Sequence, residues 1–100
     1  MGITTRLSEE GDQLDIIIAG RFDFSLHAEF RDAYRNLPPD TRFVIDLSQT
    51  TFMDSSAMGM LLLLREFAGE ASADIRLQNC SPEVRKVLSI SNLDKMFTLT

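Results

Sequence analysis

Apolar runs of strand length alternate along this chain with segments in which apolar residues recur at helical spacing. The run 42–47, RFVIDL, is short and nearly continuously apolar, which is typical of a central strand covered on both faces or close to it. In residues 73–79, Ile75 and Leu77 alternate with polar side chains, as in a strand with one buried face. Helix–strand alternation of this kind predicts an α/β domain with a mixed sheet, parallel in its interior.

The N-terminal third predicts a β-hairpin followed by a helix. Residues 4–10 and 13–21 are strand-prone and are separated by a Gly-Asp turn at 11–12. The first of these strands is polar enough to be an edge strand. Residues 25–37 carry apolar side chains at helical spacing, and the prolines at 38–39 are expected to end that helix.

The C-terminal half predicts two more helices and a short tail. The longer helix is expected to begin near Ser55, in the segment TTFMDSSAMGMLLLLREF. Ser81 is a good N-cap, and a proline follows it in the first turn of a helix that extends to about Ser91. For residues 93–100 the pattern favours either a short strand or a helical turn.

Size and charge limit the classes of function. One hundred residues, 44% of them hydrophobic, are enough for one modest core, so a single domain over residues 1–100 is expected. A net charge of −5 without a Lys/Arg cluster opposes binding to nucleic acid. The longest apolar run is too short to cross a membrane, and the N-terminus lacks the features of a signal peptide. A lone cysteine, Cys80, suits a reducing compartment, so we expect a cytoplasmic protein without membrane insertion.

The sequence does not favour an enzyme. It has no phosphate-binding glycine loop and no G-x-S-x-G motif, and His27 and Cys80 do not form a metal-ligand pattern. A Ser55–His27–Asp nucleophile system is therefore not favoured. We expect His27 to face solvent early in a helix, Cys80 to be a small buried residue near a strand end, and Asp46 to accept hydrogen bonds from backbone amides. No cofactor is expected.

The two serines of the DSS segment separate when the helix is projected at about 100° per residue. Arg65 and Glu66 mark a solvent face, and Ser55 lies between them. Ser56 points about a quarter-turn away, where it can bond backbone groups of the first turn, toward the face expected to pack on the sheet. That face carries Met60, Leu63, Leu64 and Phe67. An outward serine at a helix N-terminus can carry a phosphate, although a plain N-cap explains the same residues.

The same projection places Met58 and Leu62 on the solvent side with Ser55. Beside an outward serine they predict a docking patch, and Gly59 between them would let a partner approach the backbone. The alternatives are isolated exposed residues without a role, or residues that the chain tail covers.

Two stretches resemble the STAS domain family, specifically the bacterial anti-sigma factor antagonists. VIDLSQTTFMDSSAMGMLLL, residues 44–63, is similar to the family signature, in which a buried strand leads to an aspartate, a phosphorylatable serine and a hydrophobic helix. IIIAGRFDFSLHAEFR, residues 16–31, resembles a second element of the family, and residues 74–97 extend the similarity over nearly the whole chain.

The resemblance implies a STAS-like fold and a set of site residues. The serine that directly follows the aspartate is Ser55, which the family phosphorylates. Its neighbours in the switch are Asp54, Asp23 and Ser56. Two departures stand out. Ala57 replaces a frequent glycine, which leaves open which kinase reads the site, and the chain ends at residue 100 without the additional C-terminal helix of longer members.

The resemblance also implies partner switching that regulates transcription. The unphosphorylated protein would bind an anti-sigma factor that is also a serine kinase, a sigma factor would be released, and a PP2C-type phosphatase would reverse the phosphorylation. Two alternatives stay open. The first is a non-switched STAS subunit of a lipid-transport or stressosome-like assembly, and the second is a phospho-switched regulator of a cyclic-dinucleotide signalling enzyme. The sequence leaves both a monomer and a weak dimer possible.

Overall fold

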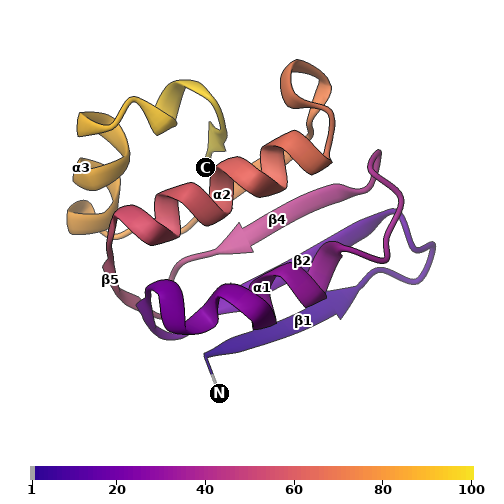
Figure 1. Ribbon diagram of the computed structural model, residues 1–100, viewed down its shortest axis with the longest axis horizontal. Coiled ribbons are helices and arrows are strands. Elements are labelled where there is room, and N and C mark those ends of the chain that lie inside the picture. The colour runs from indigo at the N-terminus through magenta and orange to yellow at the C-terminus, as the bar shows by residue number, and fades with distance from the viewer. Residues whose placement is uncertain (1) are drawn as a thin grey trace.

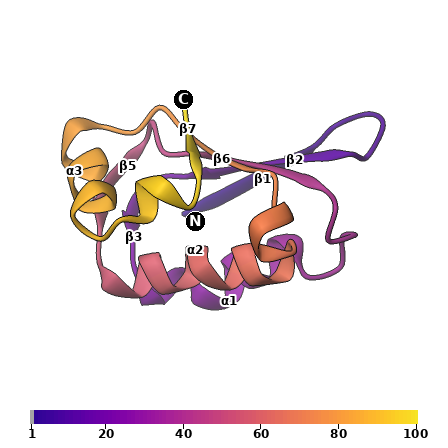
Figure 2. The same cartoon turned by 90° about the horizontal axis from the view of Figure 1, so that it is seen from above.

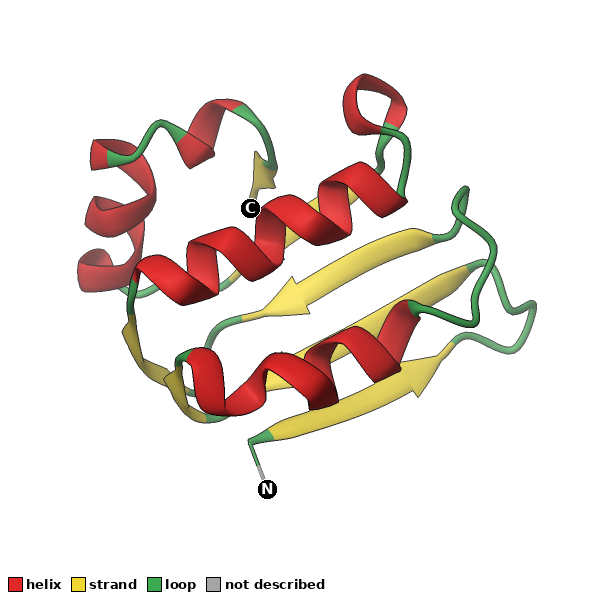
Figure 3. Ribbon diagram, viewed as in Figure 1, coloured by secondary structure: helices red, strands yellow, loops and turns green. Residues whose placement is uncertain are grey.

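A five-stranded mixed sheet forms one layer of the protein (Figures 1 and 3). The structure is a computed structural model that describes residues 2–100. In spatial order the strands are β1 (Ile3–Leu7), β2 (Gln13–Ile18), β4 (Arg42–Asp46), β6 (Ile75–Gln78) and β7 (Thr98–Leu99). Strands β1 and β2 are antiparallel and the other pairs are parallel. The predicted mixed sheet, N-terminal hairpin and edge position of β1 are thus confirmed.

The helices are α1 and α2 side by side on one face of the sheet and α3 beside the end of the sheet (Figures 1 and 2). Their bounds are α1 (His27–Tyr34), α2 (Ser55–Phe67) and α3 (Pro82–Ile90), with short 3₁₀ helices η1 (Phe24–Leu26), η2 (Glu70–Ser72) and η3 (Leu93–Lys95). The tail therefore forms both a helical turn and a short strand. No helix within residues 2–100 is both long and apolar enough to cross a membrane.

The first helix is shorter than its apolar spacing predicted. It ends at Tyr34, and the Leu37 amide donates to the Tyr34 carbonyl at 3.0 Å in a tight turn. Leu37 precedes a proline, and the proline ring disfavours helical dihedrals at the residue before it. The chain therefore leaves the helix before the two prolines rather than at them.

A second, two-stranded sheet was not predicted from the sequence. Strand β3 (Gly20–Phe22) pairs in parallel with β5 (Thr50–Met53), and Phe22 lies opposite Met53. Gly20, the first residue of β3, has a φ of 80°, a left-handed conformation that glycine adopts without strain, and the chain changes direction there after β2. The buried Thr50 hydroxyl donates to the Ile18 carbonyl at 2.8 Å and so joins this small sheet to β2. As a result, the residues after β3 and after β5 leave neighbouring strands at one edge of the molecule.

The core lies between the main sheet and the helices. Along β2 the side chains of Leu14, Ile16 and Ile18 are buried, whereas the residues between them are partly exposed. The largest fully buried side chains are Ile16, Ile18, Phe22, Phe30, Phe43, Ile45, Leu47, Leu61, Leu64, Leu77 and Leu88. Burying each such side chain stabilises the fold by about 1.5–3 kcal/mol, so this layer fixes α1 and α2 against the sheet.

Asp46, at the carboxyl end of β4, accepts the Ser48 amide at 2.9 Å and the Asn79 side-chain amide at 3.3 Å. Burial alone would raise the pKa of Asp46, but the Ser48 and Asn79 hydrogen bonds together lower it. The expectation that Asp46 accepts a backbone amide is confirmed. Cys80, just beyond β6, is partly buried and packs against the core, and burial raises the pKa of its thiol.

Candidate functional site

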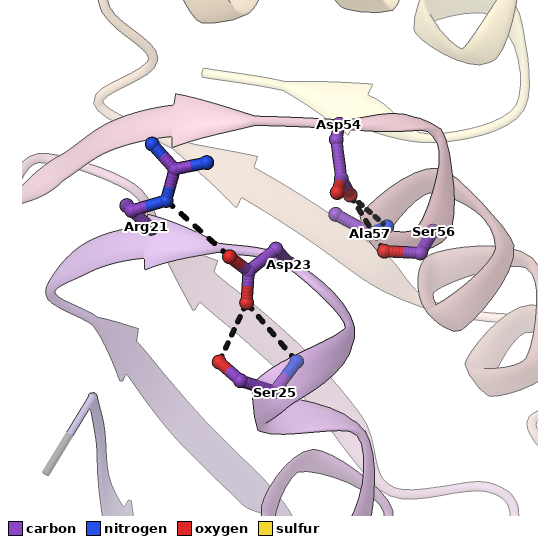
Figure 4. A network of polar contacts seen from close by, with 6 residues as sticks. All are labelled: Arg21, Asp23, Ser25, Asp54, Ser56 and Ala57. Carbon is purple, nitrogen blue, oxygen red and sulfur yellow. Dashed lines mark hydrogen bonds and ion pairs between the residues drawn. The ribbon is translucent and has the colours of Figure 1, made fainter.

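Helix α2 begins with an occupied N-cap. Asp54 has an extended backbone, and its carboxylate accepts the Ala57 amide at 3.0 Å and the Ser56 hydroxyl at 2.6 Å (Figure 4). These two hydrogen bonds, the Ser56 bond first, lower the pKa of Asp54. The N-cap explanation of the DSS segment therefore applies to Asp54, and the capping role does not fall to Ser55.

The two serines have different environments, as the helix projection predicted. Ser56 is partly buried, but it donates to the Asp54 carboxylate rather than to the backbone groups we had expected. Ser55 is exposed, and no hydrogen bond of its hydroxyl is found among residues 2–100. Ser55 is thus a free hydroxyl at the first position of a 13-residue helix, where the N-terminal amides and the helix dipole favour a negative group.

Asp23 caps the neighbouring helical segment in a similar way. Its carboxylate accepts the Ser25 hydroxyl at 2.6 Å, the Ser25 amide at 3.0 Å and Arg21 Nε at 3.4 Å (Figure 4). The hydrogen bond from the Ser25 hydroxyl is the largest cause of its lowered pKa. The negative charge of Asp23 in turn opposes the fall in the pKa of Asp54. The pairing of β3 with β5 therefore brings together the two aspartates that the resemblance assigned to the switch.

The exposed face of α2 differs from the predicted one. It runs through Ser55, Gly59, Leu63 and Glu66, and Leu63, expected against the sheet, is 49% exposed. Met58 and Leu62 were expected on the solvent side, but they are partly buried and pack against the core. The error arose from using Arg65 as a marker of solvent. The Nε atom of Arg65 is buried, since a long arginine side chain can lie along the protein surface.

Two exposed aromatic residues that lie close in sequence to the capping aspartates were missed by the sequence analysis. Phe24 is 66% exposed and stacks on His27 with ring centroids 5.0 Å apart, so His27 is partly buried rather than freely solvated. Phe52 is 40% exposed, and the Arg21 guanidinium lies 4.2 Å from its ring centroid. Phe24 directly follows the capping residue Asp23, and Phe52 belongs to β5. The spacing of apolar residues in the sequence does not distinguish either of them from a buried phenylalanine.

The site combines two capped helix starts with exposed side chains around the Ser55 hydroxyl. Among residues 2–100 there is no group of three or more histidine, cysteine or carboxylate side chains placed to hold a metal ion. Hydrogen bonds of Asp23 and Asp54 hold the two helix starts in place. The Ser55 hydroxyl and several apolar side chains nearby are exposed. The fold and this site define a small α/β domain with an exposed serine at a capped helix start.

Comparison with known proteins identifies the family. Residues 5–99 match the family model described as "Mlab, STAS domain". A STAS-domain-containing protein of Pseudomonas aeruginosa (strain UCBPP-PA14) is 52% identical over 101 residues, which cover 100% of both chains. The chain belongs to the STAS domain family, and the predicted resemblance is confirmed.

Solved structures with the same fold include anti-sigma factor antagonists. One, from Mycobacterium paratuberculosis, is 25% identical with a TM-score of 0.76, covering 97% of this chain and 84% of that chain. The Bacillus cell fate determinant SpoIIAA in its phosphorylated form is 21% identical with a TM-score of 0.69, covering 98% of this chain and 90% of that chain. The chain therefore has a SpoIIAA-like fold.

Proposed function

We propose that this protein is an anti-sigma factor antagonist controlled by phosphorylation of Ser55. In the unphosphorylated state it binds an anti-sigma factor that is also a serine kinase, and a sigma factor is thereby released. The kinase phosphorylates Ser55 and ends the binding, and a PP2C-type phosphatase restores it. On this proposal the chain is a single non-enzymatic, cytoplasmic STAS domain over residues 1–100.

The observation that carries the proposal is the free Ser55 hydroxyl beside a completed cap. Asp54 and Ser56 bond each other, so they hold the helix start without Ser55. A kinase can therefore modify Ser55 without breaking a hydrogen bond that the fold uses. A relative with the same fold, SpoIIAA, is described in both an unphosphorylated and a phosphorylated form, which supports a phosphorylation site on this fold.

The effect of a phosphate follows from its charge. It adds about −1.5 to −2 charges to a protein of net charge −5, beside the exposed face of α2. Gly59 and Leu63 lie on that face, and Met58 and Leu62 are partly accessible at its flank. A hydrated phosphate next to a surface that must lose water to bind would weaken the binding of a partner.

A non-switched STAS subunit is the second candidate. The matched family model carries the name Mlab rather than that of an anti-sigma factor antagonist, and the Pseudomonas relative is named by its domain alone. In this case the protein would be a constitutive member of a lipid-transport or stressosome-like assembly. A phospho-switched regulator of a cyclic-dinucleotide signalling enzyme would use the same Ser55 chemistry with another output.

Phosphopeptide mapping of the protein isolated from its own cells tests the proposal. Wild type, Ser55→Ala and the matched control Ser56→Ala would be recovered with and without phosphatase treatment, together with any bound proteins. We expect phosphate on Ser55 only, and a partner recovered in larger amount after phosphatase treatment of wild type. Phosphate on Ser56 would contradict the proposed switch. A partner recovered in the same amount from all samples would also contradict it and would favour the constitutive subunit.

A further inference from the structure

Helices α1 and α2 lie side by side on one side of the sheet (Figure 2). Side chains of both helices line a groove of about 490 Å³ between them. Its lining comes from both helices: His27, Arg31, Tyr34, Arg35, Leu63 and Phe67. Of these, Arg31 and Arg35 are exposed, Leu63 is 49% exposed and Phe67 is partly buried. The groove thus has one cationic wall and one apolar wall.

The charges of α1 are divided between its two flanks. His27, Arg31 and Arg35 recur every four residues, and residues four apart lie on the same side of a helix. The acidic residues of α1, Glu29 and Asp32, do not line the groove. Arg35 Nε forms an ion pair with Asp32 at 3.2 Å, but both side chains are more than half exposed, so the pair is weak and exchangeable.

The apolar wall comes from α2 and from the base of the groove. Leu63 and Phe67 are four residues apart and therefore form one stripe. Tyr34 is buried between the helices, with its ring centroid 5.1 Å from that of Phe67. Glu66, exposed on α2, is the acidic residue nearest in sequence to this stripe, and it is not part of the lining. The wall offers apolar contact beside two guanidinium groups.

We propose that this groove binds an acidic amphipathic helix of a partner protein. Arg31 and Arg35 lie about 6 Å apart along the α1 axis, at about 1.5 Å per residue. Carboxylates four residues apart on a partner helix have the same spacing, and arginine pairs well with carboxylates. The apolar residues of that helix would pack on Leu63 and Phe67, as in other helix-in-groove complexes.

Charge complementarity selects this occupant over a nucleic acid or a membrane. The protein as a whole carries −5, so an extended polyanion would meet net repulsion outside the groove. A short acidic helix contacts the cationic wall alone. The groove is the region where this acidic protein presents two exposed arginines and a histidine together.

The groove also connects the binding event to Ser55, a step that depends on the proposed phospho-switch. Because β3 and β5 are parallel and Phe22 lies opposite Met53 at their ends, η1–α1 and α2 begin at the same edge (Figure 1). His27 and Ser55 therefore lie toward the same end of the groove. A phosphate on Ser55 would add negative charge near that end and repel an acidic helix.

The test uses synthetic peptides and the ¹⁵N-labelled full chain. The probe is a helical peptide with glutamate pairs four residues apart and leucines on the adjoining face, and its counterparts carry glutamine or lysine instead of glutamate. We expect amide shifts at α1 and α2 with the glutamate peptide, weaker binding at high salt, and little binding of the other two. Arg31→Glu/Arg35→Glu should raise the Kd by about tenfold or more and should favour the lysine peptide.

A matched control changes the same charge elsewhere. Arg85→Glu/Lys86→Glu lies on the exposed side of α3 and should leave the Kd for the glutamate peptide within about twofold, because the screening length is about 8–10 Å at moderate salt. Circular dichroism checks that both double variants are folded. If glutamate disrupts α1, Arg31→Gln/Arg35→Gln is used in place of Arg31→Glu/Arg35→Glu. An equal loss of affinity for the glutamate peptide in the two double variants would show that the peptide responds only to the net charge of the protein. That result would overturn the proposal.

Other results would assign the groove to another occupant. Amide shifts in α1 and α2 that depend on protein concentration alone would indicate a second copy of this chain. Stronger shifts with vesicles of phosphatidylglycerol than with the glutamate peptide would indicate a membrane. Either result, or no binding of the peptide at millimolar concentration, overturns the proposal.

The failure of this inference can be told apart from the failure of the proposed function. The peptide titration is repeated with phosphoserine placed at position 55. Binding of the glutamate peptide that phosphoserine does not weaken would support the groove and contradict the switch. Phosphorylation of Ser55 in cells without peptide binding would support the switch and overturn the groove.

Discussion

Glutamate at Met58 or at Leu62 is expected to destabilise the protein, whereas glutamate at Leu63 is expected to change its stability little. All three are apolar residues within one and a half turns of α2. Met58 and Leu62 pack against the core, while Leu63 is 49% exposed. The comparison therefore tests directly which face of α2 packs on the core. It also tests which residues of α2 are exposed to a partner.

The expected magnitudes follow from burial. Full burial of a methionine or leucine side chain is worth about 1.5–3 kcal/mol, so a partly buried one contributes about 1–2 kcal/mol. A glutamate held against the core adds a desolvation cost of about 1–3 kcal/mol. Met58→Glu and Leu62→Glu should each lower the free energy of unfolding by about 2–5 kcal/mol. Leu63→Glu should change it by about 0.5 kcal/mol or less, as is usual for exposed positions.

Urea unfolding followed by circular dichroism measures these differences, and thermal unfolding gives an independent check. For a domain of this size, 1 kcal/mol corresponds to about 4–8 °C in Tm, so Met58→Glu and Leu63→Glu should differ by roughly 6 °C or more. Equal midpoints for the three variants, or a larger loss for Leu63→Glu, would refute the orientation of α2 and return Met58 and Leu62 to the solvent face.

Three further outcomes are expected. Thr50→Val should lower the free energy of unfolding by about 1–3 kcal/mol in urea, because it removes the buried bond to the Ile18 carbonyl. Ser56→Ala should lower the urea midpoint more than Ser55→Ala, since only Ser56 bonds the cap; equal midpoints would contradict the assignment. The lowered pKa of Asp54 adds stability that is fully present above the ordinary value of 3.8 and is lost as pH falls through the lower folded pKa. In Asp54→Asn, the Tm should therefore fall less steeply as the pH is lowered below about 4 than in the wild type. The same pH dependence of Tm in both proteins would refute this.

The hairpin and the central strands could be predicted because each has a clear pattern. Strand β2 alternates buried and partly exposed residues, and residues 43–45 of β4 are all buried, as the unbroken apolar run indicated. Strands β3 and β5 could not be predicted in the same way. They have three and four residues, and the burial of β5 is confined to its two ends, so neither shows an alternation that a sequence pattern can reveal.

Features of the site that depend on a single helix could be predicted from the sequence. Features that depend on contact between two elements could not. The different environments of Ser55 and Ser56 follow from helix geometry at the N-terminus of α2, and the structure shows them. The approach of Asp23 to Asp54 needs the pairing of β3 with β5, and only the family resemblance indicated it. The groove between α1 and α2 needs the two helices to be neighbours, a relation that the periodicity of either helix does not contain.

The two capped aspartates bear on how a phosphate at Ser55 would act. Both have lowered pKa values, so both are ionised at neutral pH, and each already accepts hydrogen bonds within its own helix start. A phosphate on Ser55 would enter a region with two fixed negative charges, while the nearby Arg21 is already paired with Asp23 and stacked on Phe52. Because the cap is complete and the Ser55 side chain is exposed, the least costly place for the new charge is the water outside the helix. The proposed switch would therefore change the surface that a partner meets and leave the fold beneath it as it is.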